Sequence, residues 1–180
     1  VWFFGGGAVH KGLDLVIDVF AKNPQLTLNI IGNLEQEQDF LNAYQYELSE
    51  LPNITYHGPL NPAGKKFNDV TSRVFCFIAP SCSESISTAV ATCLQLGLMP
   101  IISRDTGIDL PDGCGIYLES CSVEEIEAAV LKVSGMDNDS LTDQIARCQQ
   151  TALRQYSREK FSQDMTRYLA KVLVSLGKPL

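Results

Sequence analysis

One segment, residues 79–103, contains the residue types best suited to chemistry on a phosphorylated ligand. A buried strand is expected to end at Ala79, and Pro80 then opens a polar turn that carries one carboxylate, Glu84. A helix of small residues follows and ends at Gly97. Backbone N–H groups at the start of a helix are unpaired, and the helix dipole favours negative charge there. The segment therefore predicts an anion-binding site.

A second candidate for phosphate binding lies near the start of the chain, where Gly5, Gly6 and Gly7 precede Lys11. These residues could form a backbone cradle with a cation beside it, or a flexible turn with a solvated lysine. The Gly-Lys-Ser/Thr ending of a Walker loop is missing. The third glycine of the Rossmann fingerprint is missing as well, because His10 occupies its position. A generic dinucleotide-dependent dehydrogenase is therefore disfavoured.

Glu84 and the serines after it each allow two interpretations. The Glu84 carboxylate could accept a hydrogen bond from a sugar hydroxyl, or it could stabilise the helix N-terminus by about 0.3–1 kcal/mol. Ser85 and Ser87 could bind phosphate, or they could cap the helix. Cys82 lies in the same turn, but a nucleophilic cysteine needs a nearby base, and both histidines are distant in sequence. The histidines also lack carboxylates at metal spacing, so no metal site is predicted.

The elements that must position these residues alternate between strands and helices, and the strands are nearly continuous runs of Val, Ile, Leu and Phe. This pattern is typical of an α/β fold with a doubly wound parallel sheet and closing C-terminal helices. Strands are predicted at residues 1–4, 26–31, 54–57, 74–79, 99–103 and 115–118, and helices at 11–21, 35–51, 62–73, 85–96, 122–133, 140–156 and 158–176. Ligands bind at the carboxyl ends of the strands in such folds.

Local signals specify two helix starts and one unusual helix face. Asn61 suits a cap with Pro62 at the first helical position, and Ser122 with Glu125 forms a capping box. The last helix carries an apolar stripe, which predicts packing against the core or against another domain. The stripe consists of Phe161, Met165, Tyr168, Leu169, Val172, Leu173 and Leu176.

Composition indicates an ordinary globular protein, with 180 residues, 45% hydrophobic and 19% charged. A net charge of -7 argues against nucleic-acid binding. No apolar run approaches the roughly 20 residues of a membrane-spanning helix. Six cysteines without a C-x-x-C pair indicate free thiols in a reducing compartment. We expect residues 1–180 to form one domain of a longer protein, because the chain begins inside a predicted core strand.

In this order, the segments resemble the C-terminal half of a retaining GT-B fold glycosyltransferase of the group 1 family. The similarity runs from residue 1 to about 135 and returns in the final helix. It rests on Gly5 and Gly6 followed by Lys11 and Gly12, strand ends at Gly32 and Gly58, the Pro-Ser-x-x-Glu sequence of residues 80–84, Gly97 with Pro100, and Asp105, Thr106 and Gly107. The ordered set is more specific than any one of its motifs.

The resemblance implies a Rossmann-like domain that binds a nucleotide-sugar donor. Lys11 would hold the diphosphate, and Glu84 would be the catalytic carboxylate. The N–H groups of Ser85, Ile86 and Ser87 would face the sugar and phosphate. Fixed donors and a cation stabilise the negative charge that builds on a diphosphate leaving group, so neither a cofactor nor a metal is expected.

The resemblance also implies partners. The donor's base would lie near Gly32 and near Gly58 with the two residues that follow it. An N-terminal half that binds a glycan or lipid-linked acceptor would complete the enzyme, so the chain alone is expected to lack transferase activity. By this resemblance, the full-length protein would act in polysaccharide biosynthesis in the cytoplasm. Peripheral contact of the full-length protein with the cytoplasmic face of the membrane stays open.

Several positions depart from the family pattern. The family's arginine falls on Gly6, and the second glutamate of its Glu-x7-Glu pair, which holds the ribose, falls on Thr92. Ser85 and Ile86 replace the usual Gly-aromatic pair. Losing both charged contacts could weaken donor binding by a few kcal/mol, at about 1.5–3 kcal/mol for each. The alternative function is therefore a catalytically degenerate module with a structural or interaction role.

Overall fold

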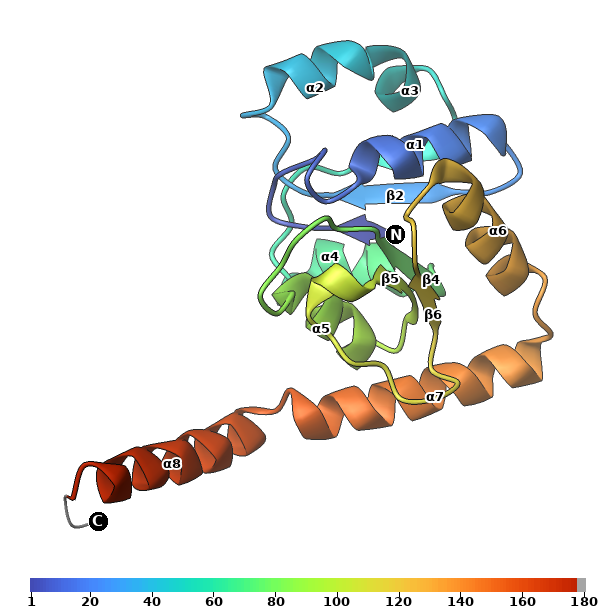
Figure 1. Ribbon diagram of the computed structural model, residues 1–180. Helices are drawn as coiled ribbons and strands as arrows, with labels where there is room; N and C mark the ends of the chain where they lie inside the picture. The colour runs from blue at the N-terminus through green and yellow to red at the C-terminus, as the bar shows by residue number, and fades with distance from the viewer. Residues whose placement is uncertain (178–180) are drawn as a thin grey trace.

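The computed structural model describes residues 1–177, which fold into an α/β domain with two parallel three-stranded sheets (Figure 1). The first sheet has the order β1-β2-β3 and the second the order β4-β5-β6. The strands are β1 (Trp2–Phe3), β2 (Leu28–Ile31), β3 (Ile54–Tyr56), β4 (Cys76–Ala79), β5 (Met99–Ser103) and β6 (Ile116–Leu118). The predicted fold class is therefore confirmed, with the strands divided between two sheets.

The two sheets meet edge to edge at β1 and β4. The N–H of Ile78 donates to the carbonyl of Val1 at 2.9 Å. Across this junction the strands follow the order 3-2-1-4-5-6, which is that of a doubly wound nucleotide-binding fold. The direction of winding reverses between β1 and β4, so a crevice is expected beyond the carboxyl ends of these two strands.

Helices cover both faces of the strands. In Figure 1, α1 and α6 lie on one side with α2 and α3, while α4, α5 and α7 lie on the other. The helices are α1 (Leu13–Lys22), α2 (Gln38–Ala43), α3 (Gln45–Ser49), α4 (Lys65–Thr71), α5 (Thr88–Gln95), α6 (Val123–Ser134), α7 (Asn138–Gln155) and α8 (Arg158–Ser175), with a short 3-10 helix η1 (Arg104–Thr106). Across residues 1–177, no helix has the length and apolar character needed to cross a membrane.

The core consists of strand residues buried from both sides, together with the inward faces of the helices that cover them. Trp2 in β1, Ile30 and Ile31 in β2, and Ile101 and Ile102 in β5 have no solvent-exposed surface. Burying an aliphatic or aromatic side chain of this size stabilises a fold by roughly 1.5–3 kcal/mol. Double-sided burial explains why the strands are continuous apolar runs rather than alternating patterns.

Two predicted helices differ from the structure. The single helix predicted over residues 35–51 is divided into α2 and α3, because Tyr44 leaves the helical backbone conformation and its ring stacks on Phe40 with centroids 4.7 Å apart. The helix predicted from residue 62 begins at Lys65. Asn61 closes a turn instead, since its carbonyl accepts the N–H of Gly64, and Gly64 is then extended before α4 begins.

The predicted cap at Ser122 is confirmed, since its hydroxyl accepts the N–H of Glu125 at 3.2 Å. The Glu125 carboxylate does not return to Ser122 as in a complete capping box. It accepts the N–H groups of Glu119, Ser120 and Cys121 at 2.8–2.9 Å. These bonds, with that from Glu119 the strongest, hold the pKa of Glu125 below its ordinary value. Glu125 thus fixes the loop between β6 and α6.

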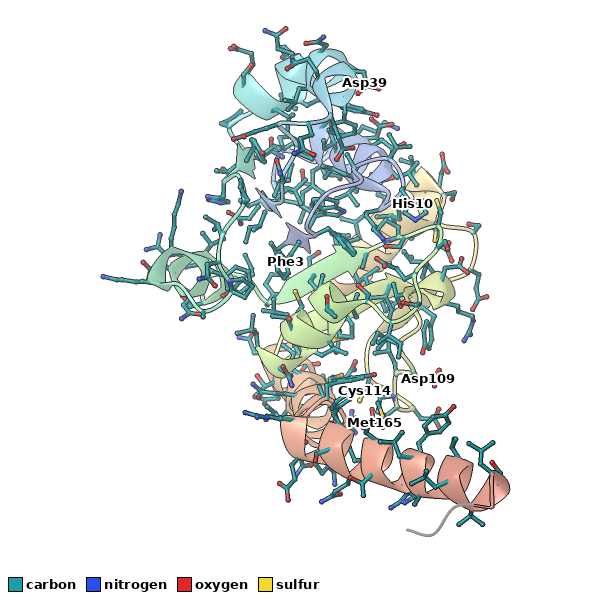
Figure 2. The ribbon with its side chains drawn as sticks, turned by 90° about the vertical axis from the view of Figure 1, so that its left-hand side faces the viewer. Phe3, His10, Asp39, Asp109, Cys114 and Met165 are labelled. Carbon is teal, nitrogen blue, oxygen red and sulfur yellow. The ribbon has the colours of Figure 1, made fainter. Side chains whose placement is uncertain are left out.

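The apolar stripe of the last helix does not join the core, because no residue of α8 is buried. Figure 1 shows α8 extending beyond the body of the domain. Phe161 and Tyr168 are 65% and 63% exposed, and with Met165 (labelled in Figure 2) they line a groove of about 760 Å³ against Ile86 and Tyr156. The prediction of core packing is therefore wrong, and packing against another domain stays a prediction.

Asp14, in the first turn of α1, is a candidate source of pH-dependent stability. One of its carboxylate oxygens is buried without a hydrogen-bond partner among residues 1–177. Burial, with a smaller contribution from the nearby charge of Asp18, raises the pKa of Asp14 above its ordinary value. The folded state therefore favours the protonated carboxyl, so this group destabilises the fold at neutral pH and ceases to do so as pH falls through its raised pKa.

Asp14→Asn is expected to raise the free energy of unfolding at pH 7 by about 1 kcal/mol, because it removes a poorly solvated charge. The gain should be smaller at pH 4 than at pH 7, because the wild-type carboxyl takes up a proton as pH falls through its raised pKa. Urea unfolding at both pH values measures the difference, and Asp39→Asn on exposed α2 is the control. A gain of equal size at both pH values would contradict the explanation.

Candidate functional site

The candidate site lies at the carboxyl ends of β1 and β4, where two loops from distant parts of the sequence meet. Cys82 donates its N–H to the carbonyl of His10 at 3.0 Å, and Nε2 of His10 (labelled in Figure 2) lies 2.9 Å from the carbonyl oxygen of Ser83. The two phosphate-binding segments predicted separately from the sequence therefore form one site. His10, although distant from Cys82 in sequence, is adjacent to it in space, but its ring contacts Ser83 rather than the thiol.

Lys11 and Glu84 form an ion pair at the centre of the site. Nζ of Lys11 lies 2.5 Å from Oε1 of Glu84, and the two side chains are only 15% and 17% exposed. The lysine also lies over the ring of Phe4, 5.6 Å from its centroid, and the Lys11 carbonyl accepts the indole N–H of Trp2. Two opposite charges that are largely withdrawn from water interact more strongly than a surface pair. A ligand that binds either charge must therefore compete with the other.

The start of α5 offers part of the predicted set of backbone donors. The hydroxyl of Ser87 caps the helix by accepting the N–H of Val90 at 3.4 Å, and the N–H of Ser87 is itself engaged by the carbonyl of Thr106 at 2.9 Å. The N–H groups of Ser85 and Ile86 make no hydrogen bond within residues 1–177, and both residues are exposed. Of the three predicted amide donors, these two remain available to an anion.

Two glycines allow other backbone segments to approach this loop closely. Gly12 has φ +68, and a Cβ there would lie 2.7 Å from the carbonyl oxygen of Pro80. Gly107 has φ +66, and a Cβ there would overlap the carbonyl oxygen of Ser85. Both positions combine a left-handed backbone with no room for a side chain. The loop after β4 is thus held between the start of α1 and the end of η1.

Phe4, over whose ring Lys11 lies, also lines a pocket of about 310 Å³. This pocket brings together residues that the sequence analysis placed near the donor's base and ribose. Gly32, Leu60 and Thr92 line it, whereas Gly58 lies just outside and accepts the N–H of Gly32 through its carbonyl at 3.2 Å. The Thr92 hydroxyl donates to the carbonyl of Thr88 at 2.8 Å, so it can only accept a hydrogen bond from a ligand.

The sequence analysis missed Glu37. Its carboxylate accepts the N–H of Gly7 at 2.7 Å and that of Ala8 at 2.8 Å. The glycine-rich loop predicted as a phosphate cradle therefore already holds an anion, supplied by the chain itself from the loop after β2. Glu37 stands in a run of polar residues at 35–39 without any distinguishing pattern, so no local signal could have found it.

The sequence of this domain matches a known protein family. Residues 1–135, which are most of the chain, match the profile of the family described as Glycosyl transferases group 1. The chain belongs to this family. A search of curated proteins finds no significant relative of this group 1 domain.

Solved structures resemble the group 1 domain in fold. Anabaena HepE, crystallised with UDP-glucose, matches with a TM-score of 0.78 at 15% identity over 94% of this chain and 48% of that one. The sucrose-phosphate synthase of Thermosynechococcus elongatus matches with a TM-score of 0.77 at 14% identity over 97% and 45%. The C-terminal domain of LpcC, a group 1 family protein of Francisella tularensis, matches with a TM-score of 0.68 at 15% identity over 87% and 85%.

These likenesses confirm the predicted fold, which is the Rossmann-like half of a GT-B glycosyltransferase. The chain spans less than half the length of HepE and of the sucrose-phosphate synthase, and most of the length of the separately crystallised LpcC domain.

Proposed function

We propose that this domain binds the nucleoside diphosphate sugar from which a full-length glycosyltransferase transfers a sugar to a glycan or lipid-linked acceptor. The observation that carries the proposal is the largely buried Lys11–Glu84 pair, together with the adjoining N–H groups of Ser85 and Ile86, which have no partner among residues 1–177, and the 310 Å³ pocket. A ligand with a diphosphate, sugar hydroxyls and a flat base fits this set of groups. The complexes of HepE with UDP and with UDP-glucose support the choice of ligand class.

Binding would rearrange the ion pair. The diphosphate would take the place of Glu84 at the Lys11 ammonium and would accept the N–H groups of Ser85 and Ile86, at the positive end of α5. Glu84, released from Lys11, would then be free to accept a hydroxyl of the sugar. As the bond between the sugar and the diphosphate breaks, negative charge builds on the leaving oxygen, and the cation and amides stabilise it.

The proposal also includes a second domain that binds the acceptor and a location in the cell. An N-terminal domain would supply the acceptor site and further catalytic groups, so the chain alone would transfer no sugar. The shorter length of the chain and the exposed stripe on α8 support such a partner domain. We place the full-length protein in the cytoplasm, with any membrane contact peripheral and at the cytoplasmic face.

Isothermal titration of the chain with UDP, GDP, ADP and their glucose conjugates tests the proposal. We expect one of these nucleotides to bind with a dissociation constant below about 1 mM, equivalent to roughly 4 kcal/mol of binding free energy. Absence of heat for every one of them at millimolar concentration would contradict it.

A catalytically degenerate module is the second candidate, and Gly6 and Thr92 favour it, because they replace the two charged contacts expected in the family. The backbone of Gly6 is not in the left-handed region, and a Cβ there would lie 3.5 Å from the Asn33 carbonyl oxygen and 3.8 Å from Oε1 of Glu37, so the backbone at this position has room for a Cβ. Sugar transfer by the full-length wild-type protein would eliminate this candidate.

Gly6→Arg and Thr92→Glu are each expected to increase the affinity for UDP or UDP-glucose about tenfold or more, because each adds a charged hydrogen bond worth about 1.5–3 kcal/mol. Isothermal titration measures the change. Gly6→Gln and Thr92→Gln, of similar size but neutral, are the controls. An affinity unchanged by both charged substitutions would place the nucleotide elsewhere on the domain.

A further inference from the structure

Glu37 occupies a position that an anionic ligand would otherwise take. The N–H groups of Gly7 and Ala8 are consecutive, and Gly7 has φ +80, so the two amides point into one small concavity of the kind that binds anions. The Glu37 carboxylate fills this concavity with two charge-assisted hydrogen bonds. Glu37 is the residue just before α2, and its two hydrogen bonds connect the loop after β2 to the loop after β1.

The segment held by Glu37 leads directly to the cation of the site. The carbonyl of Gly7 accepts the N–H of Lys11 at 2.8 Å, and the carbonyl of Ala8 accepts the N–H of Leu13 at the start of α1, also at 2.8 Å. Ala8 is fully buried, so the segment has little freedom apart from what these bonds allow. The Gly7–Ala8 peptide group therefore donates its N–H to Glu37 and accepts the N–H of Lys11 through its carbonyl, which links Glu37 to the backbone of Lys11.

We propose that Glu37 is a positioning residue for donor binding. Its carboxylate acts as a built-in anion that fixes the glycine-rich loop, excludes the diphosphate from the concavity of Gly7 and Ala8, and so holds Lys11 where it meets the diphosphate together with the start of α5. The identity of the ligand rests on the proposed function, whereas the fixing of the loop does not.

Glu37→Ala in the intact chain tests the proposal. Hydrogen exchange of the Gly7 and Ala8 amides is expected to accelerate at least tenfold, because both lose their acceptor. The affinity for UDP is expected to fall roughly tenfold, as one well-placed charged contact is lost. Acetate at high concentration should re-enter the vacated concavity, slow the exchange and restore part of the affinity. Glu35→Ala, which removes an exposed carboxylate from the same loop, should change neither quantity.

A second control separates positioning from general destabilisation. The buried amide of Asn53 donates to the carbonyls of Phe20 and Leu26 at 2.9 and 3.0 Å, at the amino end of β3 and away from the site. Asn53→Ala should lower the melting temperature without changing the affinity for UDP. The proposal is overturned if Asn53→Ala weakens UDP binding as much as Glu37→Ala, if Glu37→Ala leaves amide exchange or UDP affinity unchanged, or if acetate rescues neither.

The test keeps this inference separate from the proposed function. If the wild-type chain binds no nucleotide, the proposed function fails, while exchange of the Gly7 and Ala8 amides and its reversal by acetate still decide whether Glu37 fixes the loop. If UDP binds and Glu37→Ala has no effect on it, the positioning role fails and the donor-binding function stands.

Discussion

Lys11→Ala is expected to weaken binding of UDP about 10- to 100-fold, because it removes the ammonium that would meet the diphosphate. The loss has a second cause. Without Lys11, the carboxylate of Glu84 stays behind, only partly exposed and unpaired, and it repels the incoming phosphates. Isothermal titration measures the change, and Lys22→Ala, at the exposed opposite end of α1, is the control. An equal loss in the control would indicate a general charge effect rather than a contact.

Glu84→Gln should have the opposite effect on the same ligand. The substitution frees Lys11 and removes a like charge, so UDP should bind about fivefold more tightly, equivalent to roughly 1 kcal/mol. At the same time the contact proposed between Glu84 and the sugar is weakened. UDP-glucose should therefore lose its advantage over UDP in the variant. If Lys11→Ala and Glu84→Gln both weakened UDP binding, the proposed exchange of partners at Lys11 would be wrong.

Gly107→Ala is expected to lower the free energy of unfolding by about 2–5 kcal/mol, which combines left-handed backbone strain with a forced shift of the adjoining loop. The added methyl would overlap the carbonyl oxygen of Ser85, and a backbone carbonyl held in a tight loop cannot turn aside as a side chain can. Urea unfolding measures the loss.

Gly113→Ala provides a matched control for that substitution. Gly113 has φ +71, close to the φ +66 of Gly107, but the nearest atom to a new Cβ is a guanidinium nitrogen of Arg147 at 3.9 Å. Only the conformational strain remains, so the loss should be about 1–2 kcal/mol. Gly107→Ala should also weaken UDP binding, because it displaces Ser85 and Ile86, whereas Gly113→Ala should not. Equal losses of stability in the two variants would contradict the prediction, because the overlap with the Ser85 carbonyl oxygen would then add nothing to the backbone strain.

Local patterns predicted most of the elements, because their causes are local. The run from Met99 to Ser103 is confirmed residue for residue as β5, a mostly apolar segment that lies between Gly97 and Arg104. The Ser122 cap is confirmed as well. The predictions failed for two different reasons: the break at Tyr44 arises within the predicted helix itself, whereas the position of α8 depends on contacts with distant residues. Nothing near Tyr44 indicates that the helix must break there, and no residue in α8 shows that the core would leave its apolar stripe uncovered.

For the candidate site, too, some features follow from the sequence and others from tertiary structure. Residue types and their order were sufficient to predict an α/β fold with candidate phosphate-binding groups at its strand ends and to recognise the family, because glycines and carboxylates at such ends are features of the chain itself. Tertiary structure determined how those groups pair. It joined Lys11 to Glu84, engaged the N–H of Ser87 with Thr106, and directed Glu37 into the glycine-rich loop. The partners in these pairs lie 19 to 73 residues apart in the sequence. Hydrogen bonds and charge interactions depend on distance in space, which a local sequence pattern does not contain.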